Sequence, residues 1–112
     1  MTERDVQNQI LRTFGALPWC RLWRQNTGVA KYGEQVVRFG MPGQADLSGI
    51  IMLPGFIGVR LEIEVKKPGG RQTREQKVWH TVINTMGGIY VLATSVEDVW
   101  AELKRRGVPC DR

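Results

Sequence analysis

The stretch Leu61-Glu62-Ile63-Glu64-Val65-Lys66-Lys67 decides the fold of this chain. Its first six positions alternate between apolar and charged side chains, and a period of two is typical of a β-strand with two different faces. One face is apolar and belongs against a core. The other carries two carboxylates followed by an ammonium group. A solvated edge strand explains that charged face, and so does a strand that presents charged groups to a ligand.

A second acidic residue stands upstream, where the glycine-rich stretch 40–45 ends at Asp46 and the apolar run Leu47–Leu53 begins. Pro54-Gly55 predicts a hairpin turn, after which Val59–Lys67 returns antiparallel. Leu47–Leu53 is nearly continuously apolar, so we expect a central strand covered on both sides. Asp46 then lies near the start of one strand and Glu64 near the end of its partner. Two converging carboxylates beside a lysine predict a Mg²⁺ site.

In their order along the chain, these residues resemble the VRR-NUC family of PD-(D/E)XK nucleases, of the stand-alone phage and bacterial type. The E-x-K element alone is a weak motif, and the ordered set is much stronger. The resemblance extends from Glu3 to about Val99. It rests on Arg24-Gln25-Asn26-Thr27-Gly28, Arg38-Phe39-Gly40, Pro42-Gly43-Gln44-Ala45-Asp46, Glu64-Val65-Lys66 and Gln76.

The resemblance implies an α/β fold in a single domain, residues 1–112, with a restriction-endonuclease-like mixed sheet flanked by helices and an extra N-terminal β-hairpin. It implies a Mg²⁺ site, in which Mn²⁺ can substitute, held by Asp46, Glu64, the backbone carbonyl of Val65 and Glu3. Lys66 and Gln76 would be the remaining catalytic residues. We expect Glu62, one pleat further from Asp46, to lie outside the metal site or at the surface.

Three helices are predicted from capping signals. Thr2 caps a helix from Glu3 to Gly15, Thr73 and Gln76 form a capping box for a second, and Ser95 caps the last. The capping box gives Gln76 a structural role, whereas the resemblance places it beside the catalytic lysine, and one amide does not easily fill both roles. His80, with no acidic or cysteine partner in register, is more typical of a packed or surface histidine than of a general base.

Residues 19–26 and 35–39 predict two strands of a hairpin whose loop carries Lys31 and Tyr32. A basic and aromatic loop is able to follow a phosphate backbone and stack on an exposed base, although Tyr32 is equally typical of a solvated hairpin tip. The predicted DNA-binding residues are Arg24, Asn26, Lys31 and Arg38.

The whole chain has 112 residues, 16 Lys and Arg against 11 Asp and Glu, and a net charge of +5. This charge is compatible with a polyanionic partner but does not demand one. No apolar run has the length of a membrane span, and the charged start argues against a signal peptide. Cys20 and Cys110 form neither a metal-type pair nor a disulfide framework, so we expect two thiols in a reducing, cytoplasmic setting, in a bacterial cell or a phage-infected host.

The sequence therefore predicts a metal-dependent DNA endonuclease, and the resemblance adds a preference for branched DNA such as four-way (Holliday) junctions. Three alternatives stay open. They are a nicking, flap or exonuclease of the same superfamily, a non-catalytic DNA-binding module, and a structural or partner-binding domain. Paired cuts in a junction favour a homodimer. Trp19 and Trp23 are candidates for its interface, although these rings are also suited to fill the core.

Overall fold

The computed structural model describes residues 1–25 and 28–110, with the backbone alone at residues 28, 29, 38 and 39. The elements, in chain order, are α1 (Glu3–Gly15), β1 (Cys20–Arg24), β2 (Gly28–Tyr32), β3 (Gln35–Phe39), β4 (Leu47–Leu53), β5 (Ile57–Val65), α2 (Arg74–Thr85), β6 (Ile89–Ala93) and α3 (Val96–Arg105).

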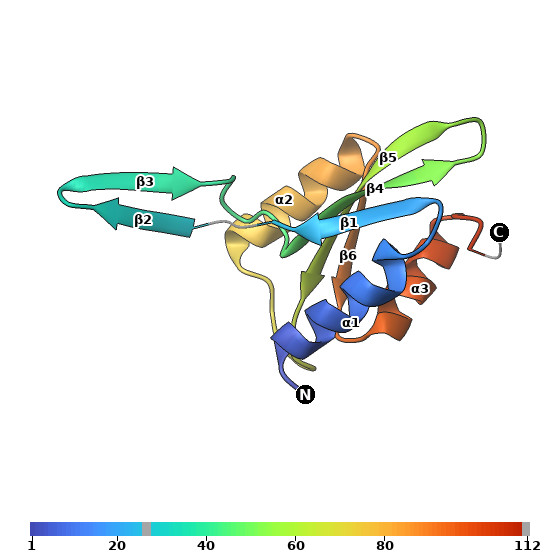
Figure 1. Cartoon of the computed structure of the whole chain (residues 1–112), viewed down its shortest axis with the longest axis horizontal. Coiled ribbons are helices and arrows are strands. Elements are labelled where there is room, and N and C mark those ends of the chain that lie inside the picture. The colour runs from blue at the N-terminus through green and yellow to red at the C-terminus, as the bar shows by residue number, and fades with distance from the viewer. Residues whose placement is uncertain (26–27, 111–112) are drawn as a thin grey trace.

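The body is an α/β fold around a mixed four-stranded sheet in the order β1-β4-β5-β6 (Figure 1). β1 and β4 are antiparallel, as are β4 and β5, whereas β5 and β6 are parallel. The α2 crossover between β5 and β6 makes this parallel pair possible, because two parallel strands need a long connection. The mixed sheet flanked by helices agrees with the coarse architecture predicted from the sequence.

The three predicted caps are present. Thr2 and Asp5 form a capping box for α1, and Thr73 and Gln76 form one for α2. The Ser95 hydroxyl accepts from the amide of Asp98 at the start of α3. Each cap satisfies amides that have no partner within the helix. Among the described residues, no helix is long and apolar enough to cross a bilayer.

The hydrophobic core lies between one face of the sheet and helices α1 and α3. The odd-numbered residues of β5 from Leu61 to Val65 point into it, together with buried side chains of both helices: Val6, Ile10, Phe14, Val99 and Leu103. Trp19 is only 4% exposed and packs edge-on against Trp100, with ring centroids 6.4 Å apart. The prediction of Trp19 at an interface is therefore wrong, because this ring fills the core.

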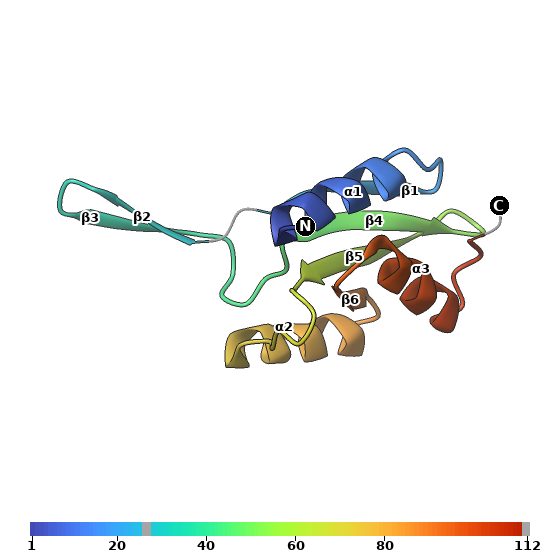
Figure 2. The same cartoon turned by 90° about the horizontal axis from the view of Figure 1, so that it is seen from below.

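Helix α2 covers the opposite face of the sheet, beside β5 and β6. In Figure 2, α1 and α2 lie on opposite sides of the sheet. Helix α2 has no buried residue. Its apolar residues recur at helical spacing, at Val78, Val82, Ile83 and Met86, yet Val78, Val82 and Met86 are 58%, 36% and 82% exposed and only Ile83 is partly buried. Gln76, Trp79 and His80 face the sheet instead, and most of the apolar stripe faces outward.

β4 is central in the sheet, but the expected cover on both sides is only partial. Ile50 is 48% exposed, and Trp23 on the neighbouring β1 is 42% exposed. Both lie on the α2 side, since their register positions and that of Glu62 share one face. α2 does not extend over this half of the sheet, so an apolar strip remains on the surface.

The extra hairpin is present, but its predicted pairing is wrong. β1 pairs with β4 in the main sheet, and residues predicted as the loop form β2, which pairs with β3 in a separate two-stranded sheet. Gly33, with φ of 63°, opens the two-residue turn, as glycine commonly does in short hairpins. Figures 1 and 2 show the hairpin projecting away from the body as an arm.

Candidate metal-binding and catalytic site

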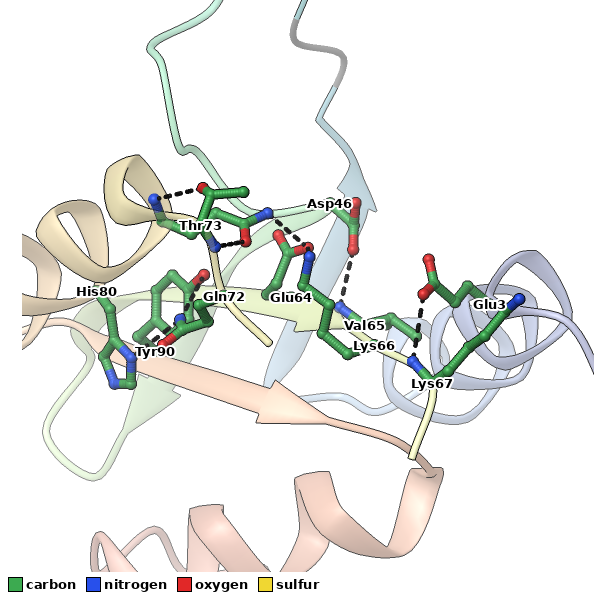
Figure 3. Close-up of polar contacts among 11 residues, drawn as sticks. Glu3, Asp46, Glu64, Val65, Lys66, Lys67, Gln72, Thr73, His80 and Tyr90 are labelled. Carbon is green, nitrogen blue, oxygen red and sulfur yellow. Dashed lines mark hydrogen bonds and ion pairs between the residues drawn. The ribbon is translucent and has the colours of Figure 1, made fainter. Parts of the chain in front are cut away.

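Two carboxylates converge where β4 begins and β5 ends. Leu47 pairs with Ile63, so the next positions outward are Asp46 and Glu64. Asp46 Oδ2 accepts from the amide of Val65 at 2.8 Å. This bond continues the β4–β5 ladder by a side chain and holds Asp46 against the end of β5 (Figure 3). The antiparallel pairing thus creates the juxtaposition expected from the sequence.

Lys66 and Gln76 complete the polar surroundings of Glu64. Lys66 Nζ lies 3.6 Å from Glu64 Oε2, and the Gln76 side-chain amide donates to the same oxygen at 3.1 Å. Gln76 also accepts from the amide of Thr73 at 2.8 Å through its oxygen. The expectation that one amide does not easily fill both roles is wrong, because its oxygen caps α2 while its nitrogen reaches the site.

Glu64 holds a proton unusually tightly. Burial raises its pKa to about 8, the neighbouring Asp46 carboxylate adds to the increase, and Lys66 opposes it. Only 4% of Glu64 is exposed. Because two like charges at one site disfavour ionisation, a cation bound beside Asp46 and Glu64 would favour the ionised form of both carboxylates. Lys66 supplies part of that positive charge.

The donors at this position fit Mg²⁺. They are oxygens, which Mg²⁺ prefers, and one or two carboxylates with several waters make an ordinary magnesium site. Val65 contributes a third oxygen, since the amide and carbonyl of one strand residue point to the same side, and its amide faces Asp46. No group of three or more His, Cys, Asp or Glu side chains suited to a metal occurs among residues 1–25 and 28–110.

Glu3, the fourth expected metal ligand, does not join a cluster with the other carboxylates. Its Oε1 accepts from the amide of Lys67 at 3.2 Å, which ties the start of α1 to the residue after the E-x-K element. In Figure 3, Asp46 lies between Glu64 and Glu3. The Glu3 oxygens are near the site, but one of them is engaged by the backbone.

The predicted DNA-binding residues have different surroundings. The Arg24 guanidinium donates to the side chains of Gln7 and Asn8, so it ties β1 to α1. Lys31 is exposed on the hairpin arm. Asn26 lies outside the described residues, as does the side chain of Arg38. Lys31 is thus the one member of this set whose described side chain is fully presented to solvent.

Glu62 is the residue whose environment the sequence predicted least well. It is fully buried on the face that α2 covers. One oxygen accepts from the Trp79 indole at 2.7 Å and from the amide of Ala45 at 3.3 Å. Alternation placed Glu62 on the charged face but did not reveal that a helix closes over it. A tryptophan three residues after Gln76 on the same helix was the available signal.

His80 packs its ring against the sheet. Its ring stacks on Tyr90 with centroids 4.2 Å apart, and Nδ1 lies 3.3 Å from the Gln72 side-chain nitrogen. Burial lowers the pKa of His80. This environment agrees with the structural role expected for the residue.

Comparison of the chain with protein-family models, with curated proteins and with solved structures finds no match. The resemblance to VRR-NUC nucleases therefore remains a prediction from the ordered motifs.

Proposed function

We propose that the protein is a metal-dependent DNA endonuclease of the VRR-NUC type, acting on branched DNA. The observation that carries the proposal is the proximity of Asp46 and Glu64, beside Lys66, where β4 begins and β5 ends. A pure DNA-binding module gains nothing from two adjacent acids, one of them buried, facing a phosphate backbone. Hydrolysis of a phosphodiester, in contrast, needs a charge-stabilising site of this composition.

Asp46, Glu64 and the Val65 carbonyl are the residues that would hold Mg²⁺ or Mn²⁺. Bound there, the ion would supply a more acidic water and positive charge for the phosphate. Lys66, next to Glu64, would orient the attacking water and offset charge that develops on the phosphate oxygens. Gln76 would hold Glu64 in one rotamer through its 3.1 Å hydrogen bond.

The hairpin arm supports DNA as the substrate. It carries the exposed Lys31 and the 63% exposed Tyr32 at its tip, away from the body. A two-stranded ribbon fits the major groove of DNA, and lysine contacts to phosphate add affinity independently of sequence. The expected cellular setting is the cytoplasm of a bacterium or a phage-infected host.

Cleavage of labelled four-way junctions, flaps, linear duplex and single strands tests the proposal. We expect cuts in Mg²⁺ or Mn²⁺ and none in a chelator. Asp46→Ala, Glu64→Ala and Lys66→Ala should each reduce the rate by at least about 100-fold, given the contribution of charge-stabilising groups. Each variant should bind DNA and melt cooperatively, which separates lost chemistry from lost folding.

The products separate the alternatives. Paired symmetric cuts in the junction support the proposed preference, while single nicks or shortening from an end support a nicking, flap or exonuclease. Binding without cleavage in any divalent metal would favour the non-catalytic module. Absence of both binding and cleavage would favour a partner-binding domain.

A further inference from the structure

Glu62 is a buried charge that connects two parts of the molecule. It lies on β5 two residues before Glu64 and is 0% exposed. Arg60 Nε is 3.5 Å from its Oε2, in ion-pair range, but does not form a hydrogen bond to it. Removing a carboxylate from water costs on the order of several kcal/mol unless ion pairs and hydrogen bonds satisfy its oxygens. A buried carboxylate with such a cost is a candidate for a specific role in the structure.

The first connection is to the loop that carries Asp46. Glu62 Oε1 accepts from the amide of Ala45, the residue directly before Asp46. Ala45 is fully buried. The Asp46 side chain accepts from the amide of Val65. Two hydrogen bonds therefore tie this segment to β5, one through the Ala45 amide and one through the Asp46 carboxylate.

The second connection is to α2. The same Glu62 oxygen accepts from the Trp79 indole at 2.7 Å. Trp79 and Gln76 are three residues apart, so they share one face of the helix. They meet Glu62 and Glu64, which share one face of the strand. With no buried residue of its own, α2 depends on such contacts for its placement.

The Asp46 loop and α2 also touch directly. A Cβ at Gly43 would lie 2.2 Å from the carbonyl oxygen of Glu75 in the first turn of α2. Gly43 has φ of 81°, which glycine adopts without strain. The loop thus packs on the helix with no space for a side chain, and a shift of either one disturbs the other.

We propose that Glu62 is a positioning residue whose single oxygen sets the placement of Asp46 relative to the helix that carries Gln76. This inference rests on the proposed nuclease function. Glu62 acts through Ala45 and Trp79 and does not contact substrate. Its hydrogen-bond geometry, rather than its charge, performs the role.

Two substitutions separate geometry from charge. Glu62→Gln keeps an oxygen able to accept both hydrogen bonds, whereas Glu62→Leu has a similar volume and accepts none. We expect Glu62→Leu to lower kcat by roughly 10- to 100-fold, with the KM for DNA within about twofold, as is usual for groups that orient ligands. Glu62→Gln should retain kcat within about threefold, since the outer-shell geometry is kept. Glu62→Leu should also weaken Mn²⁺ binding measured by calorimetry.

Two further variants serve as comparisons. Trp79→Phe keeps the ring but loses the indole donor, so it should show an intermediate loss of kcat. Tyr90→Phe removes the hydroxyl of an equally buried side chain on the same sheet face, a hydroxyl that accepts from Gln72, and it should leave kcat unchanged. Melting temperatures identify any variant that fails to fold.

Nuclear magnetic resonance of the metal-free protein provides a readout independent of cleavage. In Glu62→Leu, the amide signals of Ala45 and Asp46 and the side-chain signal of Gln76 should shift together, and in Glu62→Gln they should stay near their native positions. Unshifted Asp46 and Gln76 signals in Glu62→Leu would overturn the inference. So would a Glu62→Gln protein that folds but loses as much kcat as Glu62→Leu. If the native protein cleaves nothing, the proposed function fails and these signals still decide the role of Glu62.

Discussion

Among single residues, Glu64 makes the stability of the metal-free protein depend on pH. Its pKa is about 8 in the folded chain against an ordinary value of 4.5. The folded state therefore binds this proton more tightly than the unfolded state. The resulting stabilisation is complete below pH 4.5 and is lost as the pH rises to 8. Burial is the main cause, with Asp46 second.

We predict that Glu64→Gln removes this loss of stability. The amide carries no charge, so neither burial nor Asp46 penalises it at high pH. Thermal melts at pH 5, 7 and 9 in a chelator should show native stability falling across the range and the variant changing less. Glu97→Gln removes an exposed carboxylate from α3 and serves as the control. Parallel pH profiles for the native protein and Glu64→Gln would contradict the prediction.

Gln76 allows its two roles to be separated by a matched pair of substitutions. Gln76→Ala removes the cap to Thr73 and the bond to Glu64, whereas Thr73→Ala removes only cap contacts. Each should destabilise the protein by about 1 kcal/mol, the typical value of a helix cap. Only Gln76→Ala should lower the cleavage rate substantially. Equal cleavage rates for Gln76→Ala and Thr73→Ala, with the folded fraction of the two variants matched by denaturant, would show that the bond to Glu64 has no role in turnover.

At the scale of elements, side-chain signals predicted local structure well and distant pairing less well. Caps such as Thr2 and Thr73 act within one helical turn, so their sequence pattern is sufficient. The pairing of β1 with β4 joins residues 23 to 31 positions apart, from Arg24 with Leu47 to Cys20 with Ile51, and alternation does not specify a partner. The convergence of Asp46 and Glu64 was predictable because a short turn joins their strands.

The hairpin arm is predicted to contact the phosphate backbone. Lys31→Ala should reduce the steepness with which DNA affinity falls with salt, by about 0.9 in the logarithmic slope for one lost phosphate contact. Preference among DNA structures should change little, because phosphate contacts carry no sequence information. Titrations by fluorescence anisotropy at several salt concentrations measure the slope. Glu34→Gln, on the turn of the same hairpin, tests for a general charge effect. A flat salt dependence in the native protein would exclude contacts to the phosphate backbone.

For the whole molecule, we predict a homodimer that uses the exposed apolar strip beside α2. Trp23 and Ile50 are exposed on the part of the sheet that α2 leaves open, and Val78 and Val82 are exposed on the outer side of α2. Tryptophan is favoured at interface centres, and a two-fold dimer gives two equivalent sites for paired cuts. Light scattering at micromolar concentration measures the stoichiometry.

Trp23→Glu should convert the dimer to a monomer, because the charge would be buried at the interface. Tyr32→Glu places the same charge on an aromatic residue of the hairpin arm that is also exposed, 63% against 42% for Trp23, and should leave the dimer intact. The monomeric variant should nick a junction without pairing its cuts. A strictly monomeric native protein that still makes paired cuts would show that this symmetry argument is wrong.

The absence of buried residues in α2 has a consequence for local opening of the molecule. A helix held by a few polar contacts and one stacked ring pair has little apolar burial to lose, so it detaches at a lower free energy than the core strands. Amide hydrogen exchange should therefore release α2 before β4 and β5. Each such opening withdraws Gln76 from Glu64 while the β4–β5 ladder keeps Asp46 and Glu64 together. Asp46 and Glu64 thus stay together in the locally opened state, whereas α2 and its Gln76 leave the site.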